Sequence, residues 1–151
     1  MEKILHKELI IYKVDEKTHK KIKFNIEKEM SNLMLEFEYS PKIVSEKNYI
    51  IEAFKEDNCE MTLEEALFYK EKYLNASEEL KNLVTVSLYN EEEYIGCAHR
   101  SLDKQKIIVS LEESTPGFKN TKVRQGQWEI VLSVHGLNTD KINILLKAYS
   151  E

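Results

Sequence analysis

The sequence has few of the residues that most often mark catalysis or covalent cross-linking. Its 151 residues include 2 cysteines, 4 glycines and 2 prolines. Cys59 and Cys97 lie far apart without a Cys-x-x-Cys pattern, so we expect two reduced thiols rather than a disulfide framework or a zinc site. The glycines never cluster, so the sequence offers no glycine-rich loop to hold a phosphate.

Long apolar runs are also absent. No segment approaches the roughly 18 to 20 residues that a membrane span requires, and the first residues, Met1 to Val14, are too charged for a secretory leader. The 22 basic and 27 acidic residues give a net charge of −5, without a stripe of Lys or Arg interleaved with aromatic residues. We therefore expect a cytoplasmic protein that binds neither membranes nor nucleic acid.

The titratable residues form no recognisable catalytic or metal motif. No two of the four histidines have the spacing by which one strand or helix presents a pair of metal ligands. The acidic run Glu91-Glu92-Glu93 falls between two strand patterns and is typical of a solvated turn. No Gly-x-Ser-x-Gly motif surrounds a serine. The sequence thus predicts no catalytic residue, no metal and no cofactor, and we do not expect an enzyme.

Alternation of apolar and polar residues predicts a mainly β protein. The pattern predicts strands around Leu9 to Ile11, Ile22 to Ile26, Leu33 to Tyr39, Val84 to Leu88, Tyr94 to Ala98, Ile107 to Leu111, Trp128 to Val134 and Ile142 to Ala148. The last two, joined by the polar turn at residues 138–140, are expected to form an antiparallel hairpin. No strand–helix–strand repeat requires parallel pairing. We predict one antiparallel two-sheet sandwich covering residues 1–151.

The pattern changes between residues 42 and 81. Apolar residues recur there at helical spacing, and Thr62 followed by Glu65 fits a capping box. About forty residues without secondary structure would be unusual within a compact domain. The sequence therefore predicts a two-helix insertion at about 42–81.

Turn residues frame the strand that contains the only tryptophan. Pro116 and Gly117 predict a turn, and Gly126 predicts a break before the strand begins. Trp128 is in phase with the apolar face of its strand, so we expect it to anchor the core beneath the turn formed by Pro116, Gly117 and Phe118. A ligand-stacking role for Trp128 is the alternative.

Three polar residues are candidates for binding a ligand. His135 is out of phase with the apolar face of its strand, and His99 and Arg100 follow a short strand. Scattered surface or hydrogen-bonded structural roles are the favoured interpretation, and the alternative is that folding brings His99, Arg100 and His135 together as an anion or carboxylate site.

Several segments together resemble one known family of accessory domains. They are Tyr39-Ser40-Pro41-Lys42, Leu83 to Tyr89, Gly96-Cys97-Ala98-His99-Arg100, Ser114-Thr115-Pro116-Gly117-Phe118 and Gly126 to Leu132. In this order and spacing the chain resembles the N-terminal β-sandwich accessory domain of CehA/McbA-like PHP-class metal-dependent hydrolases. The resemblance implies a jelly-roll-like fold and an accessory role. The metal chemistry of that family resides in a separate domain rich in histidine and aspartate, so the resemblance carries no catalytic residue over to this chain.

Two functions remain open from the sequence. The first is a non-catalytic module for protein binding or assembly, which docks to a metal-dependent hydrolase or to another copy of itself through a half-apolar outer sheet face that includes Val131, Ser133 and His135. The second is a small-ligand or carbohydrate-binding module that uses His99, Arg100 and His135. A stand-alone hydrolase is a third and weaker hypothesis.

Overall fold

The chain folds mainly into antiparallel β-strands. The computed structural model describes residues 1–44, 80–98 and 102–150. Helix is limited within them to one short 3-10 turn, η1 (Lys13–Asp15), and none of these residues forms a helix long and apolar enough to cross a membrane. The strands are β1 (Glu2–Tyr12), β2 (His19–Ile26), β3 (Asn32–Ser40), β4 (Ile43–Val44), β5 (Leu80–Lys81), β6 (Leu83–Asn90), β7 (Tyr94–Ala98), β8 (Lys104–Ser110), β9 (Gly126–Gly136) and β10 (Lys141–Ser150).

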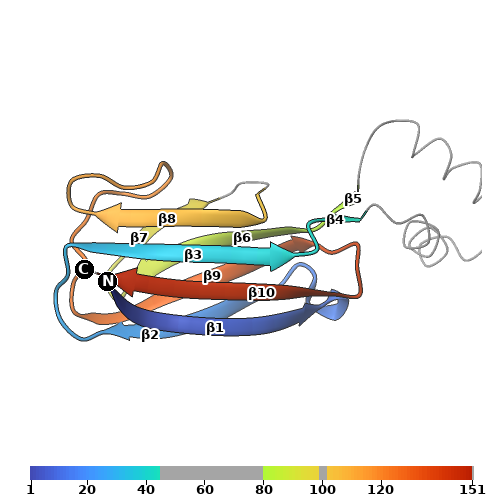
Figure 1. The fold of residues 1–151 in the computed structure, drawn as a ribbon, viewed down its shortest axis with the longest axis horizontal. Helices are drawn as coiled ribbons and strands as arrows, with labels where there is room; N and C mark the ends of the chain where they lie inside the picture. The colour runs from blue at the N-terminus through green and yellow to red at the C-terminus, as the bar shows by residue number, and fades with distance from the viewer. Residues whose placement is uncertain (45–79, 99–101, 151) are drawn as a thin grey trace, which may run out of the picture.

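Eight of these strands form two four-stranded sheets. Sheet A has the order β1-β10-β3-β8 and sheet B the order β2-β9-β6-β7, with every neighbouring pair antiparallel. The two sheets form two layers, with sheet A nearer the viewer in Figure 1. The predicted mainly β, antiparallel architecture is confirmed, and the arrangement is sandwich-like.

One hydrophobic cluster draws side chains from both sheets. The alternation that predicted the strands also predicted which side chains are buried, because successive side chains of a strand point to opposite faces. The buried members include Leu35 and Phe37 from sheet A and Leu88, Trp128 and Ile130 from sheet B. Leu111 is an exception and is 56% exposed. Strand β8 ends one residue earlier, where the Ser110 hydroxyl donates to the carbonyl oxygen of Glu113 and turns the chain.

The predicted two-helix insertion at 42–81 is wrong at the two ends that the structure describes. Ile43–Val44 pairs antiparallel with Leu80–Lys81, so both ends are extended. The adjacent β-branched residues Ile43 and Val44 favour that backbone. The Asn82 N–H donates to the carbonyl oxygen of Lys42 over 2.9 Å, beside this ladder. Residues 45–79, where the body of the insertion was predicted, lie outside the described residues.

The predicted hairpin between the last two strands is also wrong. Strand β9 belongs to sheet B and β10 to sheet A, so the short connection passes from one layer to the other. Two contacts fix this corner. Leu137 is buried in the shared core, and the Asn138 N–H donates to the Asn82 side-chain oxygen over 2.7 Å.

Asn82 is the centre of a buried polar cluster at this end of the sheets. Its side-chain nitrogen donates to the carbonyl oxygen of Pro41 over 2.8 Å and to the Thr139 hydroxyl over 3.0 Å. Its own carbonyl oxygen accepts from the hydroxyl of buried Tyr39 and from the Lys42 ammonium. Since every polar group of Asn82 has a partner, this cluster ties three chain segments together and reads as structural.

The long loop between β8 and β9 covers two sheet edges. Along β8, the Thr115 N–H donates to the carbonyl oxygen of Ile108, and the Ile108 N–H donates to the Thr115 hydroxyl. Along β7, Phe118 forms an isolated bridge with Gly96. The edge strand β1 is protected by a charge. The exposed Lys7 lies in register with the fully buried Leu146, so it is on the core-facing side of the strand. Such devices discourage edge-to-edge pairing with other chains.

Candidate functional site

His135 is the one predicted ligand-binding residue whose position the structure describes. It lies near the end of β9, exposed on the side of sheet B that faces away from the core, which we call face B. Its Nε2 lies 2.7 Å from the Thr85 hydroxyl oxygen on β6. His99 and Arg100 lie outside the described residues, so their convergence with His135 stays a prediction.

Face B brings a second histidine to the same place. His19, on β2, is in register with Ser133 on β9, and its Nδ1 lies 2.9 Å from the Ser133 hydroxyl oxygen. Ser133 is in turn in register with Thr85 on β6. Three strands therefore carry His19, Ser133 and Thr85 in one cross-strand row, with His135 two residues along β9. We call these four residues the histidine row.

The charges around the histidine row are mostly basic. On β2, Lys21 and Lys23 follow His19 on the same exposed side of the strand. Lys23 is in register with Glu129, the acidic residue that β9 places on face B. On β6 the alternate positions beside Thr85 are neutral. At the β1–β2 corner, Glu16 accepts the Leu137 N–H over 3.2 Å.

Face B is less apolar than the sequence suggested. Val131 was expected to help form a half-apolar docking surface, but it is only 8% exposed and so contributes little of it. Tyr89 and Tyr94, which showed no common pattern in the sequence, lie together at the other end of this face, with ring centroids 5.2 Å apart. Burial, and less strongly the neighbouring Cys97 and Tyr89, raise the pKa of Tyr94 above its usual 10.0.

The hydroxyl–imidazole pairs lie where the neighbouring backbone groups are already paired. A hydroxyl within hydrogen-bond reach of an imidazole is the basic unit of an activated nucleophile. An oxyanion intermediate would also need free N–H donors beside it. Ser133 lies in the middle of sheet B, between the neighbouring strands β2 and β6 whose ladders occupy its backbone groups. Among the residues that the structure describes, no group of three His, Cys, Asp or Glu side chains could hold a metal ion.

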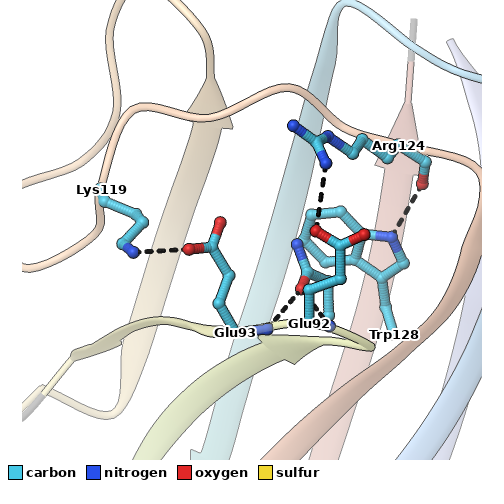
Figure 2. Close-up of polar contacts among 6 residues, drawn as sticks. Glu92, Glu93, Lys119, Arg124 and Trp128 are labelled. Carbon is cyan, nitrogen blue, oxygen red and sulfur yellow. Dashed lines mark hydrogen bonds and ion pairs between the residues drawn. The ribbon is translucent and has the colours of Figure 1, made fainter.

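The predicted structural residues around Trp128 take the expected positions in part. Trp128 is 1% exposed, which confirms a core position. Its indole N–H donates to the carbonyl oxygen of Arg124 over 2.9 Å (Figure 2). Gly117 has φ +98° and Gly126 has φ +133°, values that favour glycine at both predicted breaks. Pro116 is exposed, whereas Phe118 is buried and packs against Gly96 of β7.

The acidic turn Glu91–Glu93 is exposed as predicted, but its side chains hold the neighbouring loop. Figure 2 shows Glu93 pointing to Lys119, with 2.8 Å between carboxylate oxygen and ammonium, and Glu92 pointing to Arg124 at 3.1 Å. Glu91 accepts the Gln127 N–H over 2.8 Å. Glu93 and Glu92 thus bind two points of the loop that leads into β9, and Glu91 binds the start of β9 itself.

The outer side of sheet A, which we call face A, carries ordered rows of charge. One row runs His6, Lys147, Glu36 and Lys106 across β1, β10, β3 and β8, and the next runs Glu8, Leu145, Glu38 and Lys104. Two open grooves of about 290 and 490 Å³ lie along these rows and share Glu38 and Leu145. Ile10 is 49% exposed and Ile108 is 42% exposed at opposite margins of this face.

Comparison with known proteins adds no assignment. No family model matches the chain, and no curated protein matches it.

Proposed function

We propose that this chain is a non-catalytic jelly-roll module, spanning residues 1–151, that assembles with a second copy of itself through face A. The strand order supports the jelly roll. Counting the eight strands of the two sheets in chain order, sheet A reads first, eighth, third, sixth and sheet B reads second, seventh, fourth, fifth. This order places the two halves of the chain as interlocked Greek keys, which is the jelly-roll connectivity.

The observation that carries the assembly proposal is the self-complementary charge of face A. Consider a two-fold axis that runs parallel to the strands, between β10 and β3. Strand β3 of one copy then faces β10 of the other, and residues of the same row meet. Because Glu36 and Lys147 share a row, Glu36 of each copy meets Lys147 of the other. The dimer therefore contains this contact twice. A closed two-fold dimer requires this kind of self-complementary surface.

Neighbouring rows fit the same arrangement. Strand β8 faces β1 of the second copy, so Lys104 meets Glu8. Met34 and Tyr149 also share a row, but Met34 is only 8% exposed and adds little to the contact. Sheet twist rotates the outer strands away from one another, so the central Glu36–Lys147 contact should dominate.

The area of face A approaches that of a standard protein–protein interface. Four strands about 4.8 Å apart, with about nine residues each at about 3.4 Å per residue, project to an area on the order of 600 Å². Side-chain relief raises the accessible area above that projection, toward the roughly 800 Å² per partner of a standard interface. The exposed Ile10 and Ile108 place apolar surface at its margins.

The test is the oligomeric state of charge variants, measured by sedimentation equilibrium. We expect the wild-type chain to dimerise, Glu36→Lys to weaken dimerisation by about ten-fold or more through like-charge contacts, and the double variant Glu36→Lys/Lys147→Glu to restore it. Glu27→Lys, an exposed acid beyond β2, is the matched control and should leave the dimer intact. A wild-type monomer at high concentration, or a Glu36→Lys dimer as tight as wild type, would overturn the proposal.

The resemblance to PHP-associated accessory domains names the alternative occupant of face A. A PHP-class metal-dependent hydrolase would then replace the second copy. Mixing the chain with such a hydrolase during sedimentation separates the two cases. A mixed complex that forms at the expense of the dimer would replace self-assembly by an accessory role.

A further inference from the structure

The histidine row on face B places two exposed imidazoles in hydrogen-bond contact with hydroxyl groups, an arrangement that the packing of the sheet does not need. His19 Nδ1 lies 2.9 Å from the Ser133 hydroxyl oxygen and His135 Nε2 lies 2.7 Å from that of Thr85, so each imidazole contacts a hydroxyl on a neighbouring strand. His19 and His135 are exposed, whereas Thr85 is 2% exposed and Ser133 is half-buried. Thr85 therefore positions His135, and Ser133 is the more accessible of the two hydroxyls.

The direction of these hydrogen bonds depends on protonation. A neutral imidazole can accept from a hydroxyl, so the hydroxyl hydrogen points at the ring. A protonated imidazole has donors at both nitrogens, so His19 Nδ1 then donates to Ser133. The Ser133 hydrogen is released and can point outward. Protonation of His19 thus frees the Ser133 hydroxyl as a donor and adds a positive charge beside it.

The surrounding charges favour an anion at this point. From β2, Lys21 lies beside His19, and Lys23 lies beyond it. From β9, Glu129 faces Lys23 and lies four residues from Ser133, while β6 contributes no charge beside Thr85. At the corner before β2, Lys17 adds a positive charge next to Thr18 and His19, and the Glu16 carboxylate, which accepts the Leu137 N–H, adds a negative one.

We propose that His19, Ser133 and His135 form a binding site for a phosphate group of a small soluble molecule, which opens when the two imidazoles become protonated. A tetrahedral oxyanion has acceptor oxygens on several sides, which suits donors presented by the neighbouring strands β2 and β9. The site lies on the sheet opposite face A, so it goes beyond the assembly function and does not depend on it. Thr85 acts as a positioning residue for His135.

The test uses inorganic phosphate and sulfate as probes, with binding followed by NMR shifts of the histidine rings and by calorimetry. Sulfate keeps its double negative charge between about pH 8 and about pH 5.5, where imidazoles titrate, so its pH dependence reports the protein. We expect sulfate to bind at least ten-fold more tightly at the lower pH, and phosphate to gain less because it takes up a proton itself over this range. His19→Gln should lose most of this gain, and Ser133→Ala should weaken binding at low pH only.

Two controls separate a specific site from general charge. His6→Gln removes an exposed histidine on the other sheet and should bind as wild type does. Thr85→Val keeps the side-chain shape, and a folded variant should show a flattened pH profile if Thr85 positions His135. Equal binding by wild type and folded His19→Gln would overturn the proposal. So would binding to phosphatidic acid vesicles with no response to inorganic phosphate, because the ligand would then be a lipid.

Discussion

Phe118 lies so close to Gly96 that residue 96 has no room for a side chain. A Cβ at residue 96 would sit 2.6 Å from the Phe118 Cα and 2.3 Å from the Gly117 carbonyl oxygen. The same approach lets the Cys97 N–H donate to the Gly117 carbonyl oxygen over 3.2 Å, and the Lys119 N–H donate to that of Ile95 over 2.9 Å. The loop therefore pairs with the edge of β7, and glycine at residue 96 makes this pairing sterically feasible.

Replacing Gly96 should destabilise the chain. We expect Gly96→Ala to lower the free energy of unfolding by about 2 kcal/mol or more, because backbone atoms must move to admit the methyl group. Urea unfolding measures this effect. Gly136→Ala is the matched control, since the nearest atom to its new Cβ would be a Glu16 side-chain oxygen at 3.7 Å. Equal losses in the two variants would contradict the close approach of the loop.

Removing the Asn82 side chain should loosen the corner between the sheets. Asn82→Ala leaves the Asn138 N–H and the Pro41 carbonyl oxygen without their partner, and we expect a loss of about 3 kcal/mol. The exposed Asn25 provides the control, with a change of about 0.5 kcal/mol or less for Asn25→Ala. Hydrogen exchange should accelerate first at residues 137–141. Unchanged protection there would argue against Asn82 as the anchor.

The corner between β1 and β2 should respond to acid through Asp15. The Lys20 ammonium, 2.9 Å from the carboxylate, and the Tyr12 N–H hold the pKa of Asp15 below its usual 3.8. A depressed folded-state pKa stabilises the fold above the unfolded value, and that contribution is lost as the pH falls through the folded value. Wild type should therefore exceed Asp15→Asn in stability at neutral pH, and the difference should shrink below about pH 4. A constant difference across that range would count against this assignment.

Tyr94 should titrate above the usual phenol pKa of 10.0. Burial, Cys97 and Tyr89 together raise its pKa above 10.0, so the fold favours the neutral phenol. This contribution is present below the unfolded value and is lost as the pH rises above it. Cys97→Ser should lower the pKa of Tyr94, because the thiolate no longer repels the phenolate. The Tyr94 ring signal in NMR reports this, with Ser87→Ala, directly across from Cys97, as the uncharged control. An identical Tyr94 titration in both variants would exclude the thiolate.

The strands could be predicted because burial of one sheet face makes apolar and polar residues alternate along each strand. Leu33, Leu35 and Phe37 alternate with outward residues, and each lies in the core. The sequence pattern could not show, however, that β9 and β10 belong to different sheets instead of forming a hairpin. A hairpin turn and a crossing between sheets both need a short polar connection. The contact that holds this connection as a crossing joins Asn138 to Asn82, more than fifty residues away.

The candidate site was harder to predict than the strands, because it is formed by residues of strands that lie far apart in the sequence. His135 could be placed on the outer side of its strand from phase alone. His19 could not be associated with it, because that required the pairing of β2 with β9 and its register. The same holds for Tyr89 and Tyr94, which meet only because a tight turn pairs β6 with β7. Phase predicts the face of a residue, whereas register between strands determines its neighbours.

The pairing of β1 with β10 also determines how the chain should yield to force. Glu2 lies opposite Ser150, and the ladder runs from there to Tyr12 and Lys141. A pull applied between residues 2 and 150 would load these antiparallel hydrogen bonds one after another, as a zipper opens, rather than shear them all at once. The module should therefore open from this seam at low tension.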